Sequence, residues 1–498
     1  MNHLTIHTQS KQHNINRHIY GHFAEHLGRC IYDGLYVGES SKVAQVRGFR
    51  QDIIDALKAI NIPNLRWPGG CFADEYHWRD GIGPKAERPL RLNFWGNAPE
   101  TNAVGTHEFL DLCELLNCAP YFGGNVGSGT VQEMRDWVEY LTSNYDSNLS
   151  RLRKQNGRET AWAIPFWGIG NENWGCGGHM TPEHYADLYC QYDTFVRNYG
   201  DVNMMKIASG LGGTDHNGED IQRFMESVVK RRHPVQLEGV SIHYYIFLPH
   251  EAKHSATEFG DEEWFFVLHE ANRIDHVIHQ NAMVLDQYDP EKKIWLIVDE
   301  WGAWYPVEKG TPPAFLYQQN TLRDALVAAH TLHIFQNHGE RVQMANLAQT
   351  VNVIQSLFLT QDDKMILTPT YHVFDLFKGH QDATYLTIDL SCPSYTHGEK
   401  SLPMLSVNAS LSAQGTILLT LCNLHPRQAI TLPCQFEGRI VKQVSGKILQ
   451  AQTLQSHNTF ENPQQVVPCA FTGFYQSEQS TLMVDLPAAS IVALSIEE

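Results

Sequence analysis

The sequence predicts an α/β protein in which a (β/α)8 barrel, of the TIM-barrel type, is followed by an all-β sandwich of jelly-roll-like character. Two observations carry this prediction. Between residues 16 and 378, eight short apolar runs alternate with amphipathic stretches, which is typical of a closed parallel barrel. From residue 379 to residue 498, short alternating runs are separated by Gly, Pro, Asn and Ser, which is typical of a sandwich. An open doubly wound sheet is the rival for the first part, but the number of runs favours closure.

The eight apolar runs are predicted as barrel strands, because strands that are buried on both faces are apolar throughout. In chain order they are Ile19–Phe23, Asn64–Trp67, Ala119–Gly123, Ile164–Ile169, Met205–Ser209, Val240–Tyr244, Ile294–Val298 and Val342–Leu347.

The stretches between these runs have helical periodicity. Thr181 followed by Pro182 is typical of a helix start, with threonine as the N-cap and proline at the first helical position. The predicted helices include Phe49–Ile60, Thr106–Leu116, Val131–Thr142, Pro182–Asn198, Ile221–Lys230, Leu322–His338 and Tyr371–Phe377.

The sandwich strands are predicted from alternation of apolar and polar residues. One further strand, Leu4–Thr8, precedes the barrel, and we expect residues 1–15 to join the C-terminal sandwich. The other predicted strands are Thr384–Ile388, Leu405–Leu411, Thr416–Cys422, Ala429–Leu432, Ile440–Ile448, Thr481–Val484 and Ser490–Ser495.

The composition is that of a globular protein, with 42% hydrophobic and 18% charged residues. The net charge of −18 disfavours nucleic acid or an anionic membrane as a partner, and it is compatible with a neutral substrate such as a sugar. No stretch approaches the ~20 apolar residues that a membrane span requires.

The ten cysteines are scattered and contain no C-x-x-C pair, so no zinc site is predicted and free thiols are expected. The N-terminus lacks a basic-then-apolar signal segment. Together these features predict a cytoplasmic protein.

Two glutamates, Glu172 and Glu300, follow predicted strands in the strings Gly170–Trp174 and Val298–Gly302. In a (β/α)8 barrel the carboxyl ends of the strands form one mouth, so both side chains are expected there. Two carboxyl groups at one mouth are what glycoside hydrolysis needs: one protonates the leaving oxygen, and the other attacks the sugar or activates water. Taken singly, each glutamate has an ordinary alternative, a helix cap for Glu172 and a surface carboxylate for Glu300.

Other polar side chains are predicted at the same mouth. Arg66 is a candidate for holding Glu300 ionised, and Glu25 for binding sugar hydroxyls. Asn171 is a candidate for binding a sugar 2-hydroxyl, and Tyr245 for donating a hydrogen bond to the nucleophile. For single residues, surface ion pairs and packing are the alternatives, and the convergence of these side chains is the stronger observation.

Aromatic residues flank both glutamates. Trp174 follows Glu172, and Trp304 follows Glu300, where it would form an aromatic wall. Three histidines, His26, His179 and His243, raise the question of a metal. No H-x-x-x-H helix pair accompanies them, so no metal is predicted.

Six strings of this chain resemble glycoside hydrolase family 51, the α-L-arabinofuranosidases. They run in the family's order across most of the barrel. They are Tyr20–Tyr32, Arg66–Gly70, Tyr76–Pro84, Gly170–Glu172, Asp299–Trp301 and Leu347–Asn352.

The resemblance implies a retaining mechanism with Glu172 as the acid/base and Glu300 as the nucleophile. It implies an arabinose subsite lined by Glu25, Arg66, Asn171, Tyr245 and Gln349, with Tyr244 as the alternative to Tyr245. Cys71 stands where family members carry Asn or Cys. The loop that contains Trp174 is expected on the leaving-group side. The family also implies a hexamer and no cofactor.

The sequence therefore predicts an exo-acting α-L-arabinofuranosidase that acts on arabinofuranosyl-containing oligosaccharides derived from hemicellulose. Two alternatives remain at this point. One is an endo-acting β-glucanase or xylanase on the same barrel, and the other is a non-catalytic sugar-binding protein.

Overall fold

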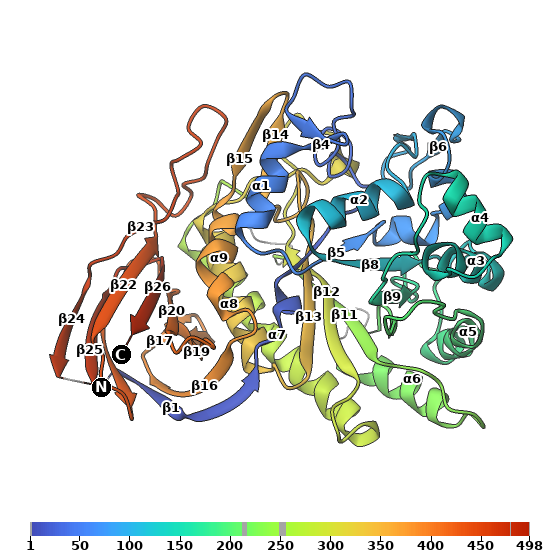
Figure 1. Ribbon diagram of the computed structural model, residues 1–498. Helices are drawn as coiled ribbons and strands as arrows, with labels where there is room; N and C mark the ends of the chain where they lie inside the picture. Colours follow the sequence, from blue (N-terminus) through green and yellow to red (C-terminus); the bar gives the residue numbers. More distant parts are fainter. Residues whose placement is uncertain (1, 212–216, 249–254, 479, 498) are drawn as a thin grey trace.

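The computed structural model describes residues 2–211, 217–248, 255–478 and 480–497. It has two parts, a barrel surrounded by helices and a β-rich part that contains both chain ends (Figure 1). The predicted fold class is confirmed, because eight parallel strands form a closed barrel and a β-rich C-terminal domain follows it.

The barrel strands are adjacent in chain order, and the last pairs with the first to close the ring. They are β2 (Gly21–Phe23), β5 (Asn64–Trp67), β8 (Ala119–Gly124), β9 (Phe166–Ile169), β10 (Met205–Ala208), β11 (Gly239–Ile246), β12 (Trp295–Ala303) and β13 (Val342–Leu347).

Several predicted barrel strands have other bounds in the structure: the predicted Ile164–Ile169 begins at Phe166, and the predicted Val240–Tyr244 runs from Gly239 to Ile246. The first half of Ile19–Phe23 is a 3-10 helix, η1 (Arg17–Tyr20), which Asn16 caps through its side chain. The predicted strand Ile294–Val298 continues to Ala303, so Glu300 lies inside β12 rather than after it.

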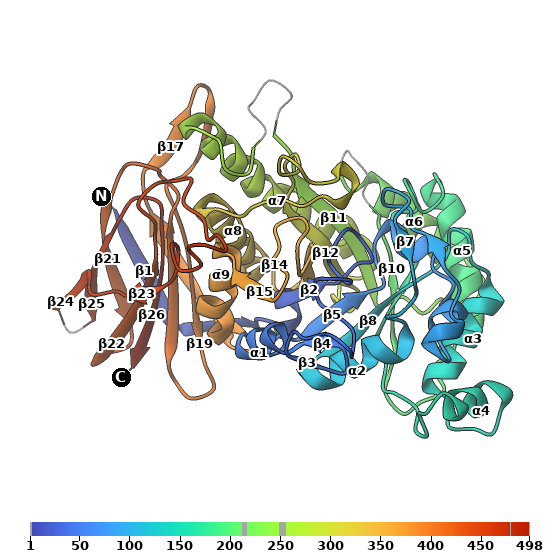
Figure 2. The same cartoon turned by 90° about the horizontal axis from the view of Figure 1, so that it is seen from above.

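Helices surround the barrel, and Figure 2 shows them from above. They are α1 (Gln51–Ala59), α2 (Thr106–Leu116), α3 (Val131–Thr142), α4 (Asn148–Gln155), α5 (Pro182–Phe195), α6 (Glu219–Val229), α7 (Asp261–Tyr288), α8 (Leu322–Asn337) and α9 (Pro369–Phe377). The sequence interpretation did not include α4 or the long α7. The predicted cap at Thr181 is present, since its side chain accepts a hydrogen bond from His184 N.

Short hairpins and 3-10 helices fill the loops of the barrel and the sheet. The hairpins pair β3 (Gln45–Val46) with β4 (Phe49–Arg50), β6 (Arg91–Leu92) with β7 (Pro99–Glu100), β14 (Phe358–Gln361) with β15 (Lys364–Leu367), and β17 (Ser394–His397) with β18 (Lys400–Pro403). The 3-10 helices are η2 (Cys71–Asp74), η3 (Trp78–Gly81), η4 (Lys85–Glu87), η5 (Pro313–Phe315) and η6 (Lys378–His380).

The β-rich part is one ten-stranded sheet with its own hydrophobic core. The N-terminal strand lies inside this sheet and not in the barrel, antiparallel to one neighbour and parallel to the other. In sheet order the strands are β23 (Cys469–Ala470), β22 (Gln443–Leu449), β26 (Ser490–Glu497), β20 (Ile417–Asn423), β19 (Leu405–Leu411), β16 (Thr384–Ser391), β1 (His3–Asn14), β21 (Ile430–Glu437), β25 (Thr481–Leu486) and β24 (Phe474–Glu478).

The barrel and the sheet meet along α8, and the contact is polar as well as apolar. His333 bridges Ser406 and Thr420, and His380 bridges Ser410 and Thr420, with both rings buried. Burial lowers the pKa of His380 to about 3. These rings are therefore neutral and act as hydrogen-bonding links between the two parts.

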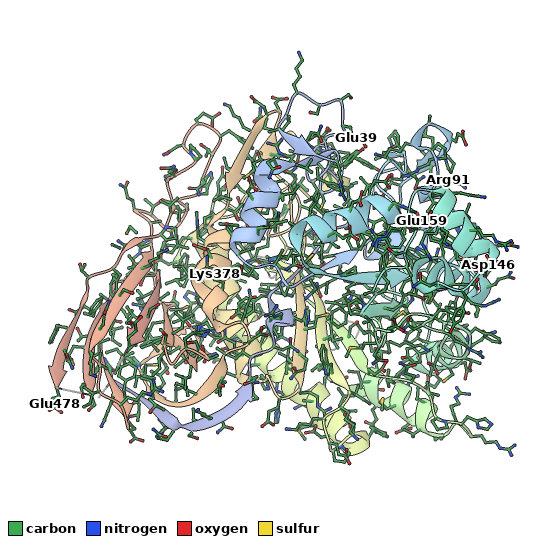
Figure 3. The ribbon with its side chains drawn as sticks, in the orientation of Figure 1. Glu39, Arg91, Asp146, Glu159, Lys378 and Glu478 are labelled. Atoms are coloured by element: carbon green, nitrogen blue, oxygen red, sulfur yellow. A yellow bond between two sulfur atoms is a disulfide. The ribbon has the colours of Figure 1, made fainter. Side chains whose placement is uncertain are left out.

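Two of the charged residues labelled in Figure 3, Asp146 and Glu159, lie at the surface. The side chains of Asp146 and Glu159 are 73% and 81% exposed. Among the described residues, no helix combines the length and apolar character that crossing a bilayer requires.

Candidate active site

Charged and polar side chains from six barrel strands or their following loops meet at the carboxyl end of the barrel. Glu25 follows β2, Arg66 lies in β5, and Asn171 and Glu172 follow β9. The remaining ones are His243 and Tyr245 on β11, Asp299 and Glu300 on β12, and Gln349 after β13. All except Glu172 and Tyr245 are buried, and these two are partly exposed.

Glu300 is held on both of its carboxylate oxygens. Arg66 Nη1 donates to Oε1 at 2.7 Å, and the Tyr245 hydroxyl donates to Oε2 at 2.8 Å. The Tyr244 hydroxyl donates instead to the Glu270 carbonyl, away from this carboxylate. The structure thus selects Tyr245 over Tyr244 as the tyrosine that contacts Glu300.

A bulge in β12 explains how two consecutive acidic side chains reach the same place. Ile242 of β11 pairs with Val298, whereas His243 pairs with Glu300, so Asp299 is an extra residue. A bulge of this kind changes the direction of the side chains beside it. As a result, both Asp299 and Glu300 contact Arg66, at 3.4 Å and 2.7 Å.

Arg66 connects three of the groups at the site. Besides Glu300 and Asp299, its Nη2 donates to Asn171 Oδ1 at 2.7 Å, and its guanidinium lies over the Phe23 ring. Burial alone would lower the pKa of Arg66, but the two carboxylates outweigh burial and raise it. The guanidinium therefore fixes the positions of its partners and compensates their charge.

His243 lies between the two glutamates. Its Nδ1 is 2.9 Å from Glu172 Oε1 and 3.4 Å from Glu300 Oε2, and its Nε2 is 3.2 Å from Asp299 Oδ1. Burial favours the neutral ring, but these three carboxylates outweigh burial and raise the pKa of His243 to about 10. At neutral pH the ring is a cation that donates to its acidic neighbours.

Asp299 is a carboxylate that contacts both Arg66 and His243. Burial would raise the pKa of its carboxyl, but Arg66 and His243 lower it to about 2. The Tyr121 hydroxyl donates to Oδ2 at 2.7 Å. Asp299 is therefore an ionised, fully buried partner that keeps both cations in place.

Glu172 and Glu300 come close to each other at His243. One oxygen of each lies within 4.8 Å of the other and of the histidine nitrogen. The Glu172 side chain is 17% exposed, whereas that of Glu300 is 6% exposed. The pair therefore consists of one carboxyl that solvent reaches and one that is held inside.

Glycine is required beside the inner carboxylate. A Cβ at Gly70 would lie 2.6 Å from Glu300 Oε1, which is closer than atoms approach. The Gly70 amide also donates to Glu25 Oε1 at 3.0 Å. The predicted Pro-Gly-Gly string thus lets the backbone pass directly behind the acidic groups.

Glu25 is fully buried in a cage of donors. Gln349 donates to Oε2 at 2.7 Å, and Trp95, which the sequence interpretation did not include, lies 3.3 Å from Oε1. Burial, followed by the nearby Glu300, raises the pKa of Glu25 to about 7. This carboxyl is thus poised between its neutral and charged forms.

The aromatic candidates differ in their placement. Trp304 packs edge-on against Tyr245, with ring centroids 5.1 Å apart, and also contacts the exposed Phe247. It forms part of a wall beside the tyrosine that contacts Glu300. Trp174 is half-buried in the loop after Glu172, outside the hydrogen-bonding network described above.

Comparisons with known proteins show the family of the chain. The family profile "Alpha-L-arabinofuranosidase 1 domain" matches residues 56–237, and "Alpha-L-arabinofuranosidase C-terminal domain" matches residues 299–490. An intracellular exo-α-L-arabinofuranosidase from Bacteroides ovatus is 46% identical over 99% of this chain and 95% of its own length. The chain belongs to glycoside hydrolase family 51.

Solved structures support the same assignment for this family 51 enzyme. The GH51 arabinofuranosidase from Xanthomonas axonopodis pv. citri superimposes with a TM-score of 0.96 at 43% identity, covering 100% of both chains. An α-L-arabinofuranosidase from Thermotoga maritima, solved as an arabinose complex, gives a TM-score of 0.87 at 30% identity, again covering 100% of both chains.

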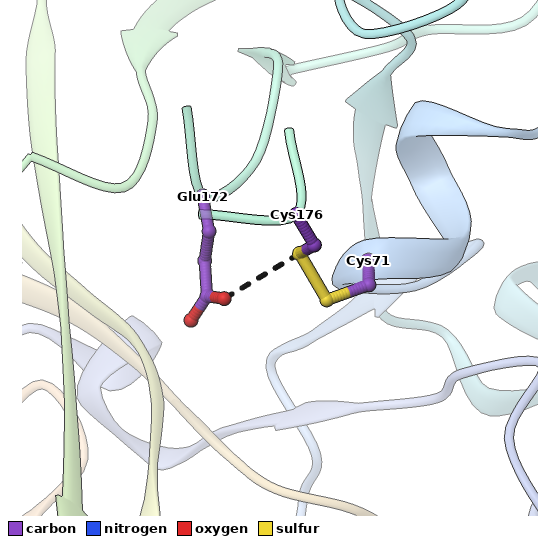
Figure 4. Close-up of side chains that lie close together, drawn as sticks. All are labelled: Cys71, Glu172 and Cys176. Atoms are coloured by element: carbon purple, nitrogen blue, oxygen red, sulfur yellow. Dashed lines mark hydrogen bonds between the residues drawn. A yellow bond between two sulfur atoms is a disulfide. The ribbon is translucent and has the colours of Figure 1, made fainter. Parts of the chain in front are cut away.

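One expectation about the family 51 enzyme is wrong: not all of its cysteines are free. Cys71 and Cys176 form a disulfide with a Cα–Cα distance of 5.5 Å, and the other eight cysteines are free (Figure 4). Cys71 therefore offers no thiol to a sugar in this form. The two residues are 105 positions apart, and only the fold brings them together.

Among the residues that the structure describes, two side-chain groups have the composition of metal sites. They are Glu172 with His243 and Glu300, and Glu172 with Cys71 and Cys176. In the first group, the neighbouring carboxylates raise the pKa of His243, which favours a protonated ring over a metal ligand. In the second, the two sulfur atoms are bonded to each other. The prediction that no metal takes part stays a prediction.

Sequence reasoning missed several residues of the site: His243 as a link between the glutamates, Asp299, and Cys176. The sequence did contain an indication for His243: it lies two residues before Tyr245 in the same strand, so the two side chains must face the same side. The sequence contained no such indication for Asp299 or Cys176, because neither a strand bulge nor a disulfide produces a periodic pattern of residues.

Proposed function

We propose that this enzyme is a retaining, exo-acting α-L-arabinofuranosidase, with Glu300 as the nucleophile and Glu172 as the acid/base. The observation that carries the proposal is the approach of the two carboxylates to within 4.8 Å at His243. Retaining glycosidases keep their two carboxyl groups ~5–5.5 Å apart, whereas inverting ones need ~6.5–9.5 Å to admit a water molecule.

In the first step Glu300 attacks the anomeric carbon of the arabinofuranosyl group. Its carboxylate pairs with the Arg66 guanidinium and is oriented by the Tyr245 hydroxyl. Glu172 donates its proton to the leaving oxygen as the glycosidic bond breaks. The Glu172 oxygen bound to His243 is Oε1, so Oε2 is the oxygen available to carry this proton.

In the second step Glu172, now ionised, removes a proton from water, and that water attacks the anomeric carbon. The bond to Glu300 breaks and the carboxylate returns to Arg66. Two inversions at one carbon release the sugar with its original anomeric configuration.

The sugar hydroxyls have donors and acceptors within reach. Glu25, Asn171 and Gln349 are buried polar side chains beside Glu300, and Gln349 Oε1 has no hydrogen-bond partner among the described residues. Buried polar atoms without partners are costly, so they are candidates for meeting a ligand. We assign these three to the arabinose subsite.

The exo action and the substrate class rest on the relatives. The Bacteroides ovatus protein is named as an exo-acting enzyme, and the Thermotoga maritima structure is titled as an arabinose complex. We propose terminal arabinofuranosyl groups of hemicellulose-derived oligosaccharides as the substrate. An endo-acting β-glucanase or xylanase on the same barrel is the second candidate, and product analysis separates the two.

We also propose that the enzyme works inside the cell, because its Bacteroides ovatus relative is named intracellular. Reporter fusion and cell fractionation test this location. The hexamer implied by the family resemblance stays a prediction, which light scattering on the purified protein checks.

The test of the catalytic roles is a pair of variants assayed on two arabinofuranosides. Glu300→Ala should abolish turnover of both substrates. Glu172→Ala should lose about 10²–10⁴-fold on an arabino-oligosaccharide but little on a dinitrophenyl arabinofuranoside, because that leaving group needs no proton. NMR of the first product should detect the α anomer. Equal losses of Glu172→Ala on both substrates, or a β product, would reject the assignment.

A further inference from the structure

The loop after Glu172 turns back onto the backbone of Glu172 itself. The amides of Gly175 and Gly177 both donate to the Glu172 carbonyl, at 2.9 Å and 2.8 Å. The backbone position of Glu172 is thus fixed by the shape of this loop. Anything that moves the loop moves Glu172 with it.

The loop is attached to the neighbouring loop after β5 at two points. One is the disulfide between Cys176 and Cys71, the first residue of η2. The other is Gly177, where a Cβ would lie 2.8 Å from Asp74 Oδ2, so the backbone packs directly on that carboxyl. The second contact is packing alone, and the disulfide is the covalent link.

The disulfide also lies against the reacting carboxyl (Figure 4). Cys176 Sγ is 3.5 Å from Glu172 Oε2 and 3.8 Å from Asn171 Nδ2. Because a disulfide sulfur carries no hydrogen, its contact with Oε2 is van der Waals packing. Glu172 is therefore held on one side by His243 and on the other by sulfur.

The hydrogen-bond and ion-pair partners of Glu300 lie outside the two loops that this disulfide joins. Its partners are Arg66, Tyr245 and His243, which lie on barrel strands. Loss of the disulfide would therefore affect the two catalytic carboxyls unequally. A positioning role of the disulfide can therefore be measured as a loss of activity that depends on Glu172 but not on Glu300.

We propose that the Cys71–Cys176 disulfide is a redox-sensitive positioning element for Glu172, and that its reduction selectively slows the steps in which Glu172 transfers a proton. A dithiol reductant supplies two electrons and two protons: the S–S bond breaks, two thiols form, and the reductant becomes a disulfide. Cys71 and Cys176 act here as positioning residues. The inference rests on the proposed role of Glu172 as acid/base.

The compartment gives this inference a context. Cytosolic disulfides are uncommon, and those that occur are mostly transient or redox-sensing. A relative that is 46% identical is named intracellular, and in such an environment the pair would meet thiol reductants. A disulfide beside the acid/base would then link hydrolysis to the thiol state of the cell.

The experiment compares the oxidised and reduced enzyme on two substrates. Thiol titration after denaturation should count eight thiols before reduction and ten after it. On reduction, kcat/KM for an arabino-oligosaccharide should fall about tenfold or more, because small misplacements of a catalytic group are costly. On a dinitrophenyl arabinofuranoside it should change less than about twofold, because that leaving group departs without a proton.

Two variants complete the test. Cys176→Ser should reproduce the selective loss without any reductant, and its activity should not change when a reductant is added. This variant tests the positioning role even if the native disulfide resists reduction. Cys190→Ser, at a half-buried free cysteine, is the matched control and should behave as the wild type.

Equal losses on both substrates would mean that the disulfide only supports the fold, and no loss despite ten titrated thiols would mean that it has no role in positioning. Either result overturns the inference. The proposed function is judged separately by Glu172→Ala: if that variant shows no dependence on the leaving group, the acid/base assignment itself fails.

Discussion

Arg66 and Glu300 form a buried ion pair in which Nη1 lies 2.7 Å from Oε1, while the adjacent Nη2 of the same guanidinium holds Asn171. One planar group thus sets the distance between the proposed nucleophile and the amide beside the proposed acid. A guanidinium has fixed donor directions, so this spacing is rigid.

Arg66→Lys should retain the positive charge but lose this spacing. A lysine ammonium cannot reach Glu300, Asp299 and Asn171 together, so we expect kcat/KM to fall about hundredfold or more and the melting temperature to drop. Arg79→Lys is the control, because Arg79 is 48% exposed and pairs with Asp136 at the surface. An Arg66→Lys variant with wild-type kinetics would show that the fork geometry is dispensable.

Tyr245→Phe tests the hydroxyl that donates to Glu300. Removing one donor from the proposed nucleophile should lower kcat about ten- to hundredfold with little change in stability. Tyr244→Phe is the matched control, since that hydroxyl donates to the Glu270 carbonyl. The control should lose about 1 kcal/mol of unfolding free energy and keep its kcat. If Tyr244→Phe were the inactive variant, the assignment of Tyr245 would be reversed.

Glu25→Gln should stabilise the protein at alkaline pH while weakening substrate binding. Burial and Glu300 raise the pKa of Glu25 from 4.5 to about 7, so the folded state binds this proton more tightly than the unfolded state. The stability that this carboxyl contributes is complete below pH 4.5 and is lost as the pH rises through about 7.

In Glu25→Gln this loss is absent, and the gain above pH 7 should be about 1–3 kcal/mol. Gln349 can turn its amide to accept from the new one, because its Oε1 is unpartnered among the described residues. Denaturant unfolding at both ends of this pH range, together with KM for an aryl arabinofuranoside, checks the two effects. A pH-independent difference in stability between the two proteins would contradict the assignment.

The histidines between the barrel and the sheet should make the protein sensitive to acid. Burial lowers the pKa of His330 to about 4 and that of His380 to about 3, both from 6.5. The unfolded state therefore takes up protons first, and stability should fall as the pH drops below 6.5, by up to about 1.4 kcal/mol per pH unit for each histidine.

Urea unfolding as a function of pH measures this slope. His380→Asn should be less stable at neutral pH, since its two hydrogen bonds to Ser410 and Thr420 are disturbed, but its stability should depend less on pH. His397→Asn is the control, because that side chain is 44% exposed and should leave the slope unchanged. Equal slopes for wild type and His380→Asn would point to other groups.

The parts of the fold that could be predicted are those whose signal is local. Strands β5 and β13 and helices α2 and α3 have the predicted bounds, because an apolar run or an amphipathic period begins and ends with them. Helix α7 was missed although it has 28 residues. Its exposed residues include Asp275, His276 and His279, and histidine and aspartate have modest helix propensity.

The site could be predicted where the order of strands determines it. Knowing that strand ends converge was enough to bring Glu25, Arg66, Glu172 and Glu300 together. The environment of each group was beyond the sequence. The charge on His243 depends on three carboxylates from two different strands or loops, and the Cys71–Cys176 link depends on how two loops approach.

The position of β1 has a consequence for how this chain is made. His3 pairs with Ser391 and Leu4 with Cys434, so β1 is made before the barrel, whereas the other strands of its sheet are made after the barrel. Until β1 pairs with them, two neighbouring edges in the middle of the sheet lack their partner. Synthesis must therefore deliver the entire barrel before the sheet can close around β1.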